Sequence, residues 1–153
     1  LNERRYMKKD NGKQLYFAIN NLGNNFNKIL DILAKEANLT KVQVTILMQV
    51  YKNNPCMINT VAEDLGLNQG NTSSICKKLE TLGYIEKERN KNDERIVNLK
   101  LTEYGNEKIK IIEEKLKSLY GYFNEFEDIK IESIIDGLNL FNEVLNYIVN
   151  KER

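Results

Sequence analysis

The chain has 153 residues, which is enough for one ordinary domain with its own hydrophobic core. Its 23 basic side chains nearly balance its 22 acidic ones, so net charge alone indicates neither a nucleic-acid partner nor an acidic substrate. The sequence has no histidine, which removes the commonest general base and the commonest zinc ligand. It also lacks a phosphate-binding glycine loop and a nucleophile elbow. We therefore expect no enzyme activity, no metal site and no cofactor.

The two cysteines, Cys56 and Cys76, are too far apart in the sequence for a CxxC pair, and they do not form a disulfide framework. The sequence shows no signal peptide and no apolar run long enough to cross a membrane. These features predict a reduced, cytoplasmic protein without a membrane partner.

The first part of the chain is predicted to be helical. Residues 1–11 are polar and basic, and they form either a solvated tail or the start of a helix. Over residues 12–37, apolar side chains recur in alternating steps of four and three, which favours packing of one helix on another. These side chains are Leu15, Ile19, Leu22, Phe26, Ile29 and Leu33.

A second helix is predicted over residues 41–53, between a capping Thr40 and the helix-breaking Pro55. Its inward side chains are expected to be Val42, Ile46, Leu47 and Val50. A short third helix is predicted over 60–65, capped by Asn59 or Thr60, with Val61 and Leu65 inward. Gly66 directly after it is the usual left-handed terminator. A fourth helix, 68–82, is predicted to follow at once with Asn68 as its cap, so the pair forms a helix-turn-helix over about 58–82.

The helix 68–82 has two different faces. Its predicted buried stripe consists of Thr72, Ile75, Cys76 and Leu79. The opposite face carries small or polar side chains, with a lysine at its edge: Gln69, Gly70, Asn71, Ser73, Ser74, Lys77 and Lys78. This face has no acid before Glu80. Such a surface suits contact with nucleotide bases and phosphates, and a polar surface helix is the alternative at this point.

A β-hairpin is predicted over residues 84–101. Residues 96–101 alternate between apolar and polar side chains, residues 84–89 form the other candidate strand, and 90–94 is a polar turn. The hairpin tip carries Arg89, Lys91 and Arg95. A hairpin after a helix-turn-helix predicts a winged helix whose wing contacts a partner, and a solvated turn is the alternative.

Two more helices are predicted over 102–151, the first capped by Thr102 and the second beginning at about residue 130. Both repeat apolar residues in steps of three and four, as the first helix does. One small domain cannot easily bury so much apolar surface. The pattern therefore predicts a homodimer formed by the terminal helices, 12–37 and 102–151, with a purely intramolecular core as the alternative.

The chain resembles the MarR family of bacterial transcriptional regulators in a series of short motifs taken in order. These are Leu39-Thr40, Ile46-Leu47, VAEDLGLNQGNTSSICKKLETLGYIEK, Asp93-x-Arg95 and Leu101-Thr102-x-x-Gly105. The resemblance implies a mainly α-helical single domain over 1–153. Its winged helix-turn-helix lobe would cover residues 40–101, with the wing over about 84–101.

The resemblance further implies a homodimer that binds a pseudo-palindromic promoter site on double-stranded DNA, usually as a repressor. Helix 68–82 would enter the major groove and wing 89–95 would reach the minor groove. The family usually has a basic residue where Glu88 stands, so backbone contacts are expected to shift to Lys87 or Arg89. The full set of expected DNA contacts is Gln69, Gly70, Asn71, Ser73, Ser74, Lys77, Lys78, Lys87, Arg89, Lys91, Asp93 and Arg95.

The chemistry of these residues agrees with the resemblance. Asn and Gln can bond adenine bidentately, lysines can neutralise phosphates, and Arg95 could enter a narrow minor groove. Asp93 is expected to hold the guanidinium of Arg95 in place by a paired hydrogen bond. Two other classes stay open: a winged-helix module for protein contact without DNA binding, and an enzyme of unusual carboxylate or lysine chemistry.

Family members commonly respond to an effector, such as a small phenolic acid, an oxidant or zinc. The first helix has no cysteine and the chain has no histidine, which disfavours the peroxide and zinc branches. Cys56 and Cys76 are either packing residues or sensors. An aromatic or phenolic ligand could contact Tyr16, Phe17, Met48, Tyr51 and Tyr104, which are otherwise core residues.

Overall fold

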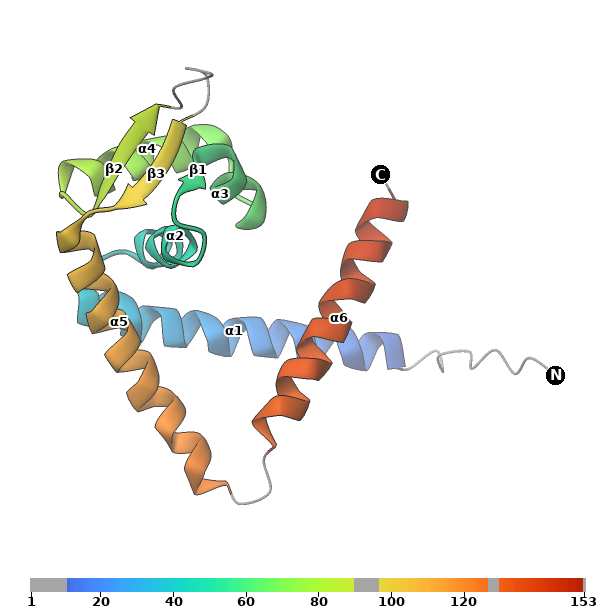
Figure 1. The fold of residues 1–153 in the computed structure, drawn as a ribbon. Helices are drawn as coiled ribbons and strands as arrows, with labels where there is room; N and C mark the ends of the chain where they lie inside the picture. Colours follow the sequence, from blue (N-terminus) through green and yellow to red (C-terminus); the bar gives the residue numbers. More distant parts are fainter. Residues whose placement is uncertain (1–10, 90–96, 127–129, 153) are drawn as a thin grey trace. The chain divides into compact units, whose positions relative to one another are not determined.

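The computed structural model describes residues 11–89, 97–126 and 130–152, and it is mainly α-helical, as predicted (Figure 1). The chain divides into two compact units, the N-terminal unit Leu1–Leu116 and the C-terminal unit Lys117–Arg153. No helix among the described residues is long and apolar enough to cross a membrane. The predicted arm at residues 1–10 lies outside the described residues.

The N-terminal unit opens with α1 (Asn11–Ala37) and α2 (Lys41–Lys52), close to their predicted bounds. Thr40 caps α2 as predicted: its hydroxyl accepts from the Gln43 amide at 3.3 Å, while the Gln43 side chain accepts from the Thr40 amide at 2.8 Å. The inward face of α2 differs in one position. Val44 is fully buried, whereas the predicted Val42 is half-buried.

Next come β1 (Cys56–Met57), α3 (Ile58–Asp64) and α4 (Gln69–Thr81), then β2 (Ile85–Arg89) and β3 (Val97–Leu101). The three strands form an antiparallel sheet in the order β1-β3-β2, in which Cys56 lies opposite Leu99 and Ile85 lies opposite Leu101. The hairpin confirms the predicted wing. Strand β1 was not predicted, because two residues are too few to show an alternating pattern.

The predicted cap of the third helix is wrong. Helix α3 starts two residues earlier than expected, at Ile58, and its N-cap is Met57, which makes no side-chain cap hydrogen bond. Met57 is also the last residue of β1, so the chain passes directly from the sheet into the helix. Asn59 and Thr60 therefore lie within the helix rather than before it.

The core of the N-terminal unit is formed where α2, α4 and the sheet meet. Its fully buried side chains include Ile46 and Leu47 of α2, Leu79 of α4 and Leu99 of β3. Helix α5 (Glu103–Gly121) adds Ile109 and Ile112. Burial of these large aliphatic side chains stabilises the packing of the unit.

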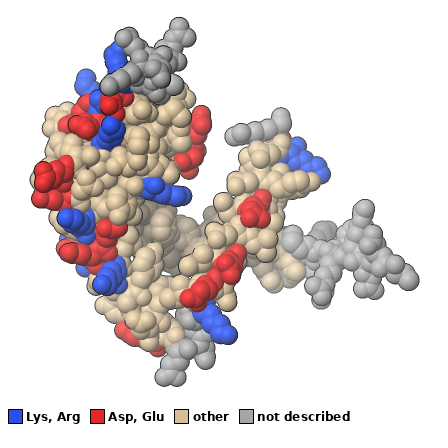
Figure 2. All heavy atoms as spheres, in the orientation of Figure 1, with Lys and Arg blue, Asp and Glu red and all other residues tan. Residues whose placement is uncertain are grey.

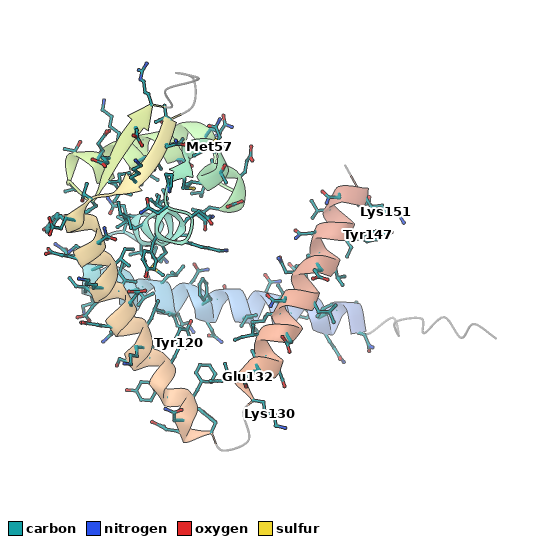
Figure 3. The ribbon with its side chains drawn as sticks, viewed as in Figure 1. Met57, Tyr120, Lys130, Glu132, Tyr147 and Lys151 are labelled. Carbon is teal, nitrogen blue, oxygen red and sulfur yellow. The ribbon has the colours of Figure 1, made fainter. Side chains whose placement is uncertain are left out.

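The C-terminal unit contains the end of α5, a short 3-10 helix η1 (Tyr122–Glu125) and α6 (Ile131–Lys151). Helix α6 has no buried residue. Its large apolar side chains are exposed, among them Ile134, Leu138, Leu145 and Ile148. Figure 3 shows Tyr147 and Lys151 close together near the end of α6, and the ammonium of Lys151 lies 5.7 Å from the Tyr147 ring centroid.

Candidate nucleic-acid interface

Helix α4 begins at a tightly specified point. Gly66 adopts a φ of 60°, which ends α3 in the left-handed region, and the Leu67 amide bonds the Ala62 carbonyl at 2.8 Å. The side-chain oxygen of Asn68 then accepts from the amides of Gly70 and Asn71, at 2.9 and 3.4 Å. The predicted cap at Asn68 is confirmed. Its side-chain oxygen is therefore already used in hydrogen bonds within the protein.

One face of α4 is buried as the periodicity predicted. Thr72, Cys76 and Leu79 are all fully buried, and Ile75 is half-buried. Thr72 is the polar member of this stripe, and its hydroxyl donates to the Asn68 carbonyl at 3.0 Å, so it enters the core with its hydrogen bond satisfied. This packing fixes which face of the helix is left for a partner.

The opposite face is exposed at every predicted position. The exposed side chains are Gln69, Gly70, Asn71, Ser73, Ser74, Lys77 and Lys78. The nearest acid on the helix, Glu80, forms an ion pair with Lys87 of β2 at 3.0 Å. The acidic group at the end of α4 is thus partly neutralised, and the exposed face presents hydroxyls, amides and ammonium groups.

Three basic side chains at the base of the wing differ in exposure and in ion pairing, and the sequence alone shows neither. Lys87 is only 25% exposed and is held by Glu80. Lys100 forms an ion pair with Glu88 across the strand pair, and the hydrogen bond and charge of that carboxylate raise the pKa of Lys100. Arg89, by contrast, is exposed at the last residue of β2. Lys91, Asp93 and Arg95 lie outside the described residues.

Acidic and basic side chains are interspersed over the visible face of the N-terminal unit (Figure 2). No single sign of charge dominates that face, in keeping with the near-neutral composition. The attraction of α4 for an anionic partner therefore depends on local placement of lysines rather than on net charge.

The five residues expected to line an effector cleft make different local contacts. Tyr16 and Phe17 are exposed on α1 with their rings edge to face at 5.6 Å, while Met48 of α2 is half-buried. A hydrogen bond to Glu113 of α5, together with its charge, raises the pKa of Tyr51. Tyr104 stacks on Tyr84 at 5.0 Å. No described contact joins all five.

A hollow of about 440 Å³ lies elsewhere, lined by Ile32, Lys35 and Glu36 of α1 and by Lys115 of α5. The ammonium of Lys115 is 3.4 Å from the Glu36 carboxylate. The hollow leaves no signal in the sequence, because no aromatic or metal-binding pattern marks these residues and they meet only when the two helices pack.

Both cysteines are free and buried. Burial raises the pKa of the Cys76 thiol to about 11, and burial followed by the charge of Asp64 raises the pKa of Cys56. Because the thiolate is the reactive form, these environments favour packing residues over sensors.

Three comparisons with known proteins agree with this geometry. The sequence profile of the family described as transcriptional regulator SarA/Rot matches residues 28–112. The helix-turn-helix transcriptional regulator SarZ of Staphylococcus saprophyticus is 32% identical over 118 residues, which cover 76% of this chain and 75% of SarZ.

Two solved structures share the fold. A MarR protein from Peptoclostridium difficile is 25% identical and aligns with a TM-score of 0.74 over 99% of this chain and 100% of its own. Reduced AbfR bound to DNA, a protein of Staphylococcus epidermidis, is 20% identical and aligns with a TM-score of 0.71 over 94% of this chain and 99% of its own.

These similarities confirm the resemblance to MarR-type winged-helix regulators, and the relatives are regulators rather than enzymes, as expected. The family match covers more than half of the chain and includes both helices of the helix-turn-helix, α3 and α4, and the wing strands. The chain belongs to the SarA/Rot family of transcriptional regulators, and it is a DNA-binding regulator with a winged helix-turn-helix fold.

Proposed function

We propose that two copies of this chain bind a pseudo-palindromic promoter site, with α4 of each copy in the major groove, and repress transcription there. The observation that carries this proposal is the exposed, acid-free face of α4 from Gln69 to Lys78. Packing of the opposite stripe holds that face outward, so it is available without rearrangement of the helix.

The residues on this face take different roles. Gln69 and Asn71 have exposed amides that can bond adenine, whereas the side-chain oxygen of Asn68 is already used as the helix cap. Ser73 and Ser74 offer short hydroxyls near the bases. Lys77 and Lys78 are exposed ammonium groups that would neutralise phosphates and release counterions.

At the wing we assign the backbone contact to Arg89 in preference to Lys87. Lys87 is held by Glu80 and is largely covered, while Arg89 is exposed at the end of its strand. We retain Lys91 and Arg95 as contacts of the wing tip, with Asp93 holding Arg95, as sequence-based proposals.

The homodimer in this proposal forms through α1, α5 and α6. Helix α6 and the first half of α1 expose many large apolar side chains, which a soluble monomer rarely leaves open to water. A two-fold dimer would cover them and would place the two α4 helices about one DNA turn apart, roughly 34–36 Å.

Release by a small aromatic or phenolic ligand is the regulatory part of the proposal. The candidate contacts remain Tyr16, Phe17, Met48, Tyr51 and Tyr104. A regulator of a bacterial promoter works beside the chromosome, so we place it in the cytoplasm.

The proposal is tested by a mobility shift with the promoter DNA upstream of the protein's own gene, at two salt concentrations. We expect binding that weakens steeply with salt, and Lys77→Ala should weaken it for all sequences. Lys52→Ala, a change at an exposed lysine of α2 outside both α4 and the proposed dimer helices, is the matched control. A folded dimer with no affinity for any duplex would favour a winged-helix module for protein contact instead.

A further inference from the structure

Helix α4 ends at a junction with the turn into β2, the start of α5 and the end of α1. Gly83 has a φ of 75°, Tyr84 follows it, and the Tyr84 amide bonds the Leu79 carbonyl of α4 at 3.0 Å. The Tyr84 carbonyl in turn accepts from the Thr102 amide at 3.2 Å. The C-terminal end of α4, the recognition helix of the proposed function, is therefore linked through Tyr84 to Thr102, the residue before α5.

The start of α5 is held against the same residue. The Thr102 hydroxyl donates to the Gly83 carbonyl at 2.5 Å and accepts from the Gly105 amide at 2.9 Å. A Cβ on Gly105 would lie 1.9 Å from the Tyr84 carbonyl oxygen, so the backbones touch. The Tyr84 ring is buried and stacks on Tyr104.

Lys108, one turn further along α5, connects this junction to α1. Its ammonium lies 5.4 Å from the Tyr84 ring centroid and donates to the carbonyl of Ala37, the last residue of α1, at 3.1 Å. A cation at this position bonds a terminal carbonyl and faces the negative end of the α1 dipole. One side chain thus joins the end of α1, the exit of α4 and the body of α5.

We propose that Lys108 is a positioning residue that sets the direction of the recognition helix relative to α1 and α5. This inference rests on the proposed function, in which α1 and α5 belong to the dimer contact and α4 reads DNA. If the dimer holds α1 and α5, the tie through Lys108 and Tyr84 determines how far apart the two α4 helices stand. Lys108 touches no DNA and acts through Tyr84.

The probe for the test is a duplex selected from random-sequence DNA by the wild-type protein, together with versions that add or remove one base pair between the half-sites. Lys108→Met keeps the aliphatic stem but loses the charge and the donor. We expect it to bind the selected duplex about ten-fold more weakly, the scale of one hydrogen bond to a charged group. It should also discriminate less among spacings, while its affinity for unselected DNA stays unchanged.

The control is Lys110→Met, a change on the same helix at an exposed lysine that makes no ion pair or hydrogen bond with the described residues. Lys108→Arg should restore most of the spacing preference, since a guanidinium can both bond a carbonyl and stack on a ring. A lysine that only stabilised the fold would lower the melting temperature of Lys108→Met and leave the spacing profile of the folded protein unchanged. That result would overturn the proposal.

Two further outcomes are distinguishable. If Lys108→Met does not fold at the assay temperature, Lys108→Gln keeps a donor for Ala37 without the charge. It should show a smaller change in spacing preference in the same direction, and an unchanged profile overturns the proposal equally. If the wild-type protein selects no duplex at all, the proposed function itself fails and this inference fails with it.

Discussion

The close approach of Gly105 to the backbone of Tyr84 predicts a large effect of adding a single methyl group. In Gly105→Ala the new Cβ would lie 1.9 Å from the carbonyl oxygen and 2.9 Å from the carbonyl carbon of Tyr84. Real Cβ atoms essentially never come within 3.0 Å of such atoms. The neighbour is backbone of a buried residue, bonded to Thr102 and stacked on Tyr104, so it cannot move aside cheaply.

The magnitude follows from two opposing effects. Overpacking a tight site costs about 1–3 kcal/mol, and an overlap with fixed backbone belongs at the upper end of that range. Alanine regains up to about 1 kcal/mol of helix propensity over glycine. We therefore expect Gly105→Ala to lower the free energy of unfolding by roughly 2 kcal/mol.

The assay is urea denaturation followed by circular dichroism at one fixed protein concentration, because the apparent stability of the proposed dimer would depend on concentration. Gly121→Ala is the matched control, since that glycine is helical and nothing lies within 4 Å of its added Cβ. We expect this control to be as stable as the wild type or slightly more stable. A Gly105→Ala protein as stable as the Gly121→Ala protein would refute the reasoning about the close approach.

Three other outcomes are expected. Asn68→Ala should cost about 1 kcal/mol in urea denaturation through loss of the α4 cap, and Asn68→Asp should keep most of it, so equal losses in both variants would contradict the cap. Asn71→Ala should weaken the preference for particular bases in a binding selection by about 1–3 kcal/mol. Lys77→Ala should lower the slope of log affinity against log salt concentration by about 1 and leave the base preference intact. Burial keeps the native Cys76 thiol protonated to about pH 11, whereas the unfolded thiol ionises above about pH 9. The neutral thiol therefore stabilises the folded protein fully below pH 9, and this contribution is lost as the pH rises towards 11. Wild-type stability should therefore fall over that window by about 2 kcal/mol more than that of Cys76→Ala, and parallel pH curves would contradict this.

Much of the architecture could be read from local spacing. The stripe of Thr72, Cys76 and Leu79 identified the buried side of α4, and the exposed side followed from it. Asn68 and Thr40 marked helix starts because a capping side chain bonds amides only two or three residues away. Such signals are local, so they are visible in the sequence before any tertiary contact is known.

Local spacing was therefore enough to predict most of the helices, the wing hairpin and the exposed face of α4. Tertiary structure alone decided the contacts between distant segments. It paired Cys56 with Leu99 and brought Lys108 to Ala37. It also tied Lys87 to Glu80, which left Arg89 as the exposed cation of strand β2. None of these has a local pattern, because which residues meet across a fold depends on how whole elements pack and not on the spacing within any one of them.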